Sequence, residues 1–219
     1  TGTGQLHVKF RSNDLLSDYD FSRINIEAIN KTKLGKFDLR TRLFGQWGSG
    51  SDMPFESSLM LAGANTEELL DNKYTRSRGF FPDEWVDFGE TTGHFHAGGG
   101  LNLRGYAGYL VADTSAEEGS INAYSGMSGV AANVELQFNR LFKFQLIKFI
   151  KMEPYLFADA GIISTDDRFD RVADLRVDAG IGTAFTWSWF GPLETVKPIT
   201  LRVDFPLFLN RTPYEDGEF

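Results

Sequence analysis

The stretch AANVELQFNR, residues 131–140, decides the fold class, because apolar and polar side chains alternate along it. The apolar residues stand at even positions and the polar ones at odd positions: Ala132, Val134, Leu136 and Phe138 against Asn133, Glu135, Gln137 and Asn139. A period of two places the two sets on opposite faces of a β-strand. The stretch therefore predicts a strand with one apolar and one polar face.

The same period recurs along the chain, most clearly in DLRVDAGIGTAFTW (174–187), ITLRVDF (199–205) and QLHVKFR (5–11). Turn-rich segments separate such runs, which predicts an all-β, antiparallel fold. About nine strands are expected, over residues 4–12, 22–32, 36–46, 54–62, 86–97, 127–140, 153–164, 173–188 and 197–209.

Alternation is compatible with two architectures, a soluble sandwich or barrel and a transmembrane β-barrel. The first buries the apolar set inside, whereas the second turns it toward lipid and keeps the polar set in a wet lumen. The polar sets here are rich in charge and glycine, and the clearest runs reach the roughly 9–11 residues that a tilted strand needs to cross a bilayer. These features favour the membrane, and they predict six lipid-facing side chains: Leu136, Phe138, Val177, Ile181, Leu201 and Val203.

Composition and missing motifs narrow the range of functions that the chain could have. The 219 residues carry a formal net charge of −8, which argues against nucleic acid as a partner. The chain has no cysteine, no HExxH and no G-x-S-x-G motif, so neither a catalytic constellation nor a cofactor is expected. His94 and His96 are interpreted as polar residues of a lumen or rim and not as metal ligands. No apolar run of about 18 residues is present for a transmembrane helix, and the opening TGTGQLHVKF suggests a cut N-terminus.

The connections predict a topology. KLGK (33–36) is a short turn, whereas 13–20, 48–54, 165–173 and 98–126 are longer and polar or rich in glycine. Short turns of membrane barrels are periplasmic and longer loops are external. We therefore expect those four segments on one side, and 33–36 on the other with 63–85, 141–152 and 189–196.

Two of the periplasmic segments carry local signals. In ANTEELLDNKYTR, Asn65 and Thr66 precede two glutamates, which indicates a helix start. The aromatic and basic run 141–152 is either a strand that continues past the membrane edge or an interfacial amphipathic segment.

The run GGGLNLRGY (98–106) resembles the loop-six motif of the BamA-type outer-membrane surface-antigen superfamily, a glycine pair followed by Val/Leu-Arg-Gly-Phe/Tyr. Further segments resemble family elements in the same order: VELQF (134–138), FADAG (157–161), RVDAGIGTAFTWSWFGPL (176–193) and LRVDFPL (201–207). Together they span roughly residues 90–210.

The resemblance implies a sixteen-stranded barrel in the bacterial outer membrane, with loop six, at about 98–126, folded into the lumen. The periplasmic POTRA domains of the family and about six barrel strands are not visible. We therefore interpret residues 1–219 as an incomplete outer-membrane β-barrel domain, comprising middle and late strands. The expected partners are the lipid bilayer, other outer-membrane or periplasmic proteins, and barrel strands from the same or another chain.

In this family the loop-six arginine pairs with acids of the inner wall, and that position is Arg104 here, followed by Gly105 and Tyr106. Residue parity agrees independently. Asp159 and Gly161 lie on the polar face of their strand, and Glu135 lies on the polar face of its own. Both carboxylates are therefore candidate acceptors for a guanidinium fork. The alternative is that Arg104 is a solvated loop residue.

Glycines are expected to shape this loop. Gly98, Gly99 and Gly100 permit a sharp turn because glycine accepts positive φ without steric cost. Gly105 is expected to let the backbone run close to the barrel wall.

Three functions stay open at this point. The first is insertion, assembly or translocation of other proteins by a BamA-type barrel. The second is a barrel that anchors or exports a fused upstream enzyme, such as a peptidase or phospholipase. The third is a porin-like channel.

Overall fold

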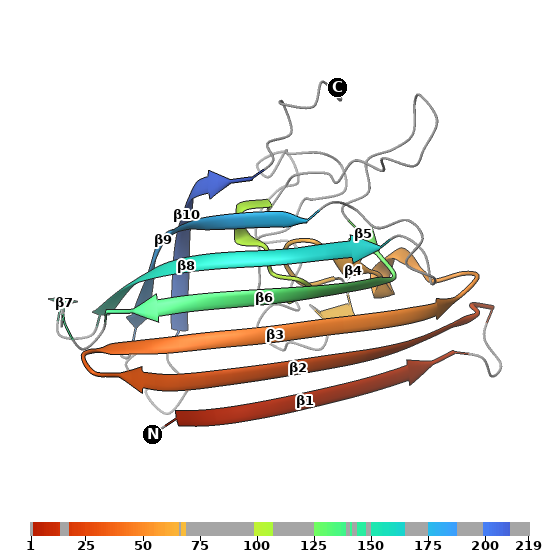
Figure 1. The fold of residues 1–219 in the computed structure, drawn as a ribbon, viewed down its shortest axis with the longest axis horizontal. Helices are drawn as coiled ribbons and strands as arrows, with labels where there is room; N and C mark the ends of the chain where they lie inside the picture. Colours follow the sequence, from red (N-terminus) through yellow and green to blue (C-terminus); the bar gives the residue numbers. More distant parts are fainter. Residues whose placement is uncertain are drawn as a thin grey trace.

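Seven long antiparallel strands form one sheet, so the all-β, antiparallel fold is confirmed (Figure 1). The computed structural model describes residues 2–13, 18–65, 67–68, 99–106, 125–138, 141, 144–147, 150–164, 175–187 and 199–210. The strands, in spatial order, are β1 (Gly2–Ser12), β2 (Phe21–Leu34), β3 (Phe37–Gly50), β6 (Ser128–Gln137), β8 (Ile150–Ser164), β9 (Arg176–Trp187) and β10 (Ile199–Leu209).

The alternation separates the sheet into an apolar face and a polar face. The apolar face exposes large side chains on every one of the seven strands, including Phe10, Ile26, Leu43, Val134, Leu156, Ile181 and Leu201. Five of the six side chains predicted to face lipid, those of Leu136, Val177, Ile181, Leu201 and Val203, belong to this face by register, and Ile181 and Leu201 are exposed there. Phe138 follows directly after the end of β6. The polar face carries the buried residues of the same strands, among them Asn133, Glu135, Asp159 and Asp178.

β3 and β6 are direct neighbours in the sheet, and this corrects the predicted up-and-down order of the strands. Asp38 to Gln46 pair with Gln137 to Gly129, although about eighty residues separate the two strands. The predicted strand 54–62 is wrong. It contains a 3-10 turn, η1 (Phe55–Ser57), and a two-residue strand, β4 (Leu59–Met60), that is not part of the large sheet. The predicted strand 86–97 lies outside the described residues.

The whole of residues 51–127 is therefore one insertion between adjacent strands, which we call the inserted segment. The expectation for 63–85 is wrong in its described part. Residues 63–65 and 67–68 belong to this insertion, on the side expected for loop 98–126 and not on the opposite side. The sequence indicated the turn at 48–54 correctly. The apolar residues that follow it are buried within the inserted segment, and their pattern resembles that of a strand.

The inserted segment forms a small core against the polar face of the sheet. β4 pairs with β5 (Ser125–Gly126), and the backbone N–H groups of Leu101 and Leu103 donate to the carbonyls of Met60 and Leu61. Buried apolar side chains of the inserted segment pack against those of the large sheet, which we call the wall. Those of the segment are Leu59, Met60, Leu61, Leu101, Leu103 and Tyr106, and those of the wall are Phe44, Ala131 and Ile163. Among the described residues, the side chains packed against this face of the sheet thus come from the inserted segment, including its two-stranded β4–β5 sheet.

The strand registers agree with the predicted sides. Ser12 pairs with Ser22, Gly50 with Phe21 and Ser128 with Ser164, so the strand ends that flank 13–20, the inserted segment and 165–173 lie at one end of the sheet. Residues 165–173 themselves lie outside the described residues. Leu34 pairs with Phe37 at the other end, next to the positive-φ Gly35. At that end β7 (Phe144–Ile147) forms a hairpin with the start of β8, so the strand alternative is the one observed in this part of 141–152.

Candidate functional site around Arg104

The loop that carries Arg104 begins with left-handed backbone. Gly99 and Gly100 have φ values of 116° and 52°, and Asn102 has φ 57°. A Cβ atom on Gly100 would lie 2.5 Å from the carbonyl oxygen of Met60. The structure thus requires glycine at Gly99 and Gly100, as the sequence indicated, whereas Gly98 lies outside the described residues.

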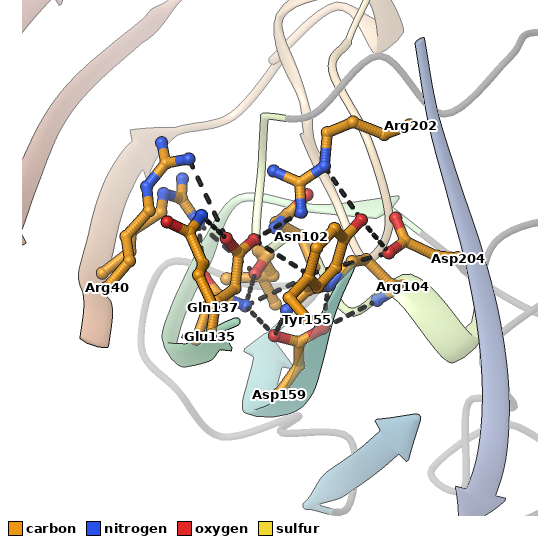
Figure 2. A network of polar contacts seen from close by, with 12 residues as sticks. Arg40, Asn102, Arg104, Glu135, Gln137, Tyr155, Asp159, Arg202 and Asp204 are labelled. Atoms are coloured by element: carbon orange, nitrogen blue, oxygen red, sulfur yellow. Dashed lines mark hydrogen bonds and ion pairs between the residues drawn. The ribbon is translucent and has the colours of Figure 1, made fainter. Parts of the chain in front are cut away.

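Arg104 contacts both of the carboxylates predicted as its acceptors (Figure 2). Its Nε donates to Asp159 Oδ2 at 2.7 Å and its Nη2 to Asp159 Oδ1 at 2.8 Å, which is the bidentate fork. Its Nη1 donates to Glu135 Oε1 at 3.0 Å. The backbone N–H of Arg104 also points to Asp159 Oδ2, at 3.3 Å. Arg104 is therefore directed into the polar face and is not a solvated loop residue.

The surroundings of Arg104 are nearly dry. Its side chain is 3% exposed and that of Asp159 0%. The guanidinium lies over the ring of Phe157, with Cζ 4.1 Å from the ring centroid. Burial by itself would lower the pKa of Arg104, but the hydrogen bond and charge of Asp159 and the charge of Glu135 raise it overall. The loop thus presents a permanent cation to the wall.

The two residues after Arg104 attach the loop to β9 and β10. A Cβ on Gly105 would lie 2.7 Å from Asp178 Cβ, so the backbone approaches the wall as closely as expected. The hydroxyl of buried Tyr106 donates to Asn210 Oδ1 at 2.7 Å. Gly161 has a related role on β8, because a Cβ there would lie 3.3 Å from a methyl group of Leu103. Small residues in the wall therefore accommodate the loop.

Three residues of this network were not singled out in the sequence. Arg202 Nη2 donates to Glu135 Oε1 at 2.6 Å, and its Nε to the Tyr155 hydroxyl at 3.1 Å. Tyr155 in turn donates to Asp204 Oδ1 at 2.5 Å. Arg202 and Asp204 stand on the polar positions of their strand, so parity places them on this face but does not single them out. Figure 2 shows these side chains, Tyr155 from β8 and Arg202 and Asp204 from β10, converging with Arg104.

Asn133 and Asp178 were missed as well. Asn133 Nδ2 donates to Asp159 Oδ1 at 3.0 Å. Asp178 is fully buried and pairs in register with Asp159 on the neighbouring strand. Both follow the polar parity of their strands, but no rule of sequence says which polar position meets a loop.

The arrangement can hold a loop, and its chemistry is that of ion pairing. Arg104 and Arg202 share Glu135, and Arg104 also binds Asp159, so β6, β8, β10 and the loop are joined through charge-assisted hydrogen bonds. Within the described part of the chain, no group of three His, Cys, Asp or Glu side chains is placed to hold a metal ion. Among those same residues, no helix has the length and hydropathy of a membrane span.

No family model matches this chain, and no curated protein is detectably similar to it.

Proposed function

We propose that the chain forms part of the wall and the inserted loop of an outer-membrane β-barrel of the BamA type, which inserts, assembles or translocates other proteins. The observation that carries the proposal is the loop arginine held by two inward carboxylates, Arg104 with Asp159 and Glu135. This is the pairing that the loop-six resemblance implies. In this proposal the inserted segment is loop six, and it extends from residue 51 rather than from about residue 98.

The apolar face supports a lipid environment. Monomeric soluble proteins rarely expose apolar patches beyond a few hundred Å². Here the exposed apolar side chains extend across all seven strands, and these strands are 10 to 15 residues long. Such lengths suffice to cross a bilayer at the usual tilt. Within the described residues β1 and β10 are not paired with each other, so we propose that further strands close a sixteen-stranded barrel.

The experiment that tests the function compares matched variants of the intact protein in lipid vesicles. Arg104→Ala removes the loop cation, and Lys33→Ala removes a cation at the far end of the sheet. Insertion of an unfolded outer-membrane protein into the same vesicles is followed by its acquired resistance to protease. We expect Arg104→Ala to slow insertion and Lys33→Ala to leave the rate unchanged.

Other results would point to the other functions. Equal insertion rates for the parent protein, both variants and empty vesicles would contradict the proposal. A large steady ion conductance of the parent protein without insertion activity would favour a porin-like channel. An upstream peptidase or phospholipase domain that stays active in Arg104→Ala would favour an anchoring barrel.

A further inference from the structure

A second arginine of the wall binds the backbone of the same loop. Arg42, on the polar face of β3, donates from Nη2 to the carbonyl oxygen of Gly100 at 2.8 Å and from Nη1 to that of Leu101 at 3.5 Å. Its Nε donates to Glu27 Oε1 at 2.5 Å, which fixes the guanidinium plane. The guanidinium also lies over the ring of Phe44, with Cζ 4.7 Å from the centroid.

Asn133 extends this binding to the next peptide. Its Nδ2 is 3.0 Å from the carbonyl oxygen of Asn102 and 3.3 Å from that of Leu101, while its Oδ1 accepts from Arg42 Nη1 at 2.8 Å. Three consecutive carbonyls, those of residues 100–102, therefore point at two wall side chains. They do so because Gly100 and Asn102 have positive φ, which turns the peptide groups toward β3 and β6.

We propose that Arg42 and Asn133 form a backbone clamp that selects the docked, left-handed conformation of turn 99–102, as a second attachment beside Arg104. The clamp binds main-chain carbonyls. Its hydrogen bonds therefore depend on the backbone conformation of the turn and not on the side chains of the turn. Both are positioning residues, and their part in protein insertion rests on the proposed function. Lysine cannot replace Arg42, because three separate nitrogens in one plane meet Glu27, Asn133 and Gly100.

Loop release can be measured directly, because the chain contains no cysteine. Leu103 is fully buried when the loop is docked, so Leu103→Cys reports undocking through its rate of reaction with a maleimide. In the intact protein in vesicles, Arg42→Ala in this background is expected to raise the labelling rate about tenfold or more, the effect of losing hydrogen bonds to a charged donor. Asn133→Ala should raise it too, and Arg42→Lys should resemble Arg42→Ala.

The matched control is Arg40→Ala, which removes the preceding polar-face arginine of β3; its ion pair is a 4.0 Å contact with Glu135. Labelling at the parent rate in Arg42→Ala, or an equal increase in Arg40→Ala, would overturn the clamp. Full rescue by Arg42→Lys would overturn it as well. If Arg42→Ala/Arg104→Ala labels no faster than Arg104→Ala, Arg42 makes no contribution of its own and the proposal fails.

Insertion activity, measured on the same vesicles, separates the two proposals. Faster labelling with unchanged insertion would support the clamp and contradict the role of the docked loop in the proposed function.

Discussion

At the scale of single residues, geometry explains why the loop carries arginine at position 104. Its nitrogens divide between two carboxylates on adjacent strands, two toward Asp159 and one toward Glu135. A lysine ammonium is a single point charge and cannot span both acceptors in this way. The pair is also buried, so removal of one partner leaves a charge without compensation.

We therefore expect Arg104→Ala to destabilise the docked loop by about 3–5 kcal/mol, the cost of breaking a buried ion pair. Arg104→Lys should recover only a minor part of this loss. The maleimide reaction of Leu103→Cys measures both effects. Equal protection of the introduced thiol in the parent background and in Arg104→Ala would contradict the assignment.

Gly105 is expected to resist substitution for a steric reason. In Gly105→Ala the new methyl group would overlap Asp178 Cβ, 2.7 Å away, and overpacking costs about 1–3 kcal/mol. Gly4→Ala is the control, because its nearest contact would be 3.9 Å away. Thermal unfolding should show a lower midpoint for Gly105→Ala alone. A shift of the same size in Gly4→Ala would show a general effect of adding Cβ atoms.

Glu68 gives the loop a pH dependence. The backbone N–H of Asn65 donates to Glu68 Oε2 and the Asn65 side chain accepts from the Glu68 N–H, which is a capping-box arrangement at the predicted helix start. Burial raises the pKa of Glu68 above its ordinary value, although the hydrogen bond from Asn65 and the charges of Arg23 and Arg42 lower it. The folded state therefore binds the proton more tightly than the unfolded state.

A raised carboxyl pKa contributes stability that is complete below the unfolded pKa, 4.5, and is lost as pH rises through the folded pKa. Glu68→Gln keeps an oxygen acceptor without the charge, so it should unfold at a higher temperature than the parent near neutral pH. The difference in unfolding temperature between Glu68→Gln and the parent should shrink as the pH falls toward 4.5. If the difference in unfolding temperature grew as the pH fell, the raised pKa of Glu68 would be contradicted.

At the scale of the elements, alternation predicted the long strands because residues of opposite parity lie on opposite faces, one apolar and one polar. Leu156, Ala158 and Ala160 on one side and Phe157 and Asp159 on the other show this on β8. The loop-six resemblance implied acidic partners for Arg104, and polar parity agreed for both Asp159 and Glu135. The failure at 54–62 has a clear cause: Leu59, Met60 and Leu61 are buried in the core of the inserted segment, and burial gives a loop the apolar pattern of a strand.

The contacts of Arg42 and Asn133 could not be foreseen from the sequence. Parity places their side chains on the polar face, but their acceptors are carbonyls that any sequence would supply. Only the positive φ values of Gly100 and Asn102 direct those carbonyls to the wall. Asn102 is one of the few residue types that tolerate this conformation, which is a weak signal before the structure is known.

The apolar face gives a prediction at the level of strands. Ile181, near the middle of β9, and Leu34, at the end of β2, are similarly exposed, at 45% and 48%. In a bilayer, Ile181→Arg should cost about 2–4 kcal/mol, whereas Leu34→Arg, near the interface, should cost about 0–1 kcal/mol. Unfolding of the two variants from vesicles measures the difference. Equal and small effects would show that neither side chain contacts lipid.

At the scale of the whole molecule, the pairing pattern divides the connections between the two ends of the sheet. Each long strand is antiparallel to its neighbour in the sheet. The registers therefore show at which end of the sheet each strand begins and ends. If the sheet spans a membrane, the two ends face different compartments. The inserted segment then enters the lumen from the side of 13–20 and 48–54.

Single cysteines can test this topology, since the parent chain has none. Asp18→Cys and Asp52→Cys lie at one end and Lys36→Cys at the other, and all three positions are exposed. A membrane-impermeant maleimide added to intact cells should label the Asp18→Cys and Asp52→Cys variants, because long loops are external. The Lys36→Cys variant should react only after the outer membrane is opened, because tight turns are periplasmic. Labelling of the Lys36→Cys variant alone would invert the orientation while preserving the division into two ends. Equal labelling of all three variants in intact cells would be incompatible with a sheet that crosses the membrane, and the exposed apolar face would then require a protein partner in place of lipid.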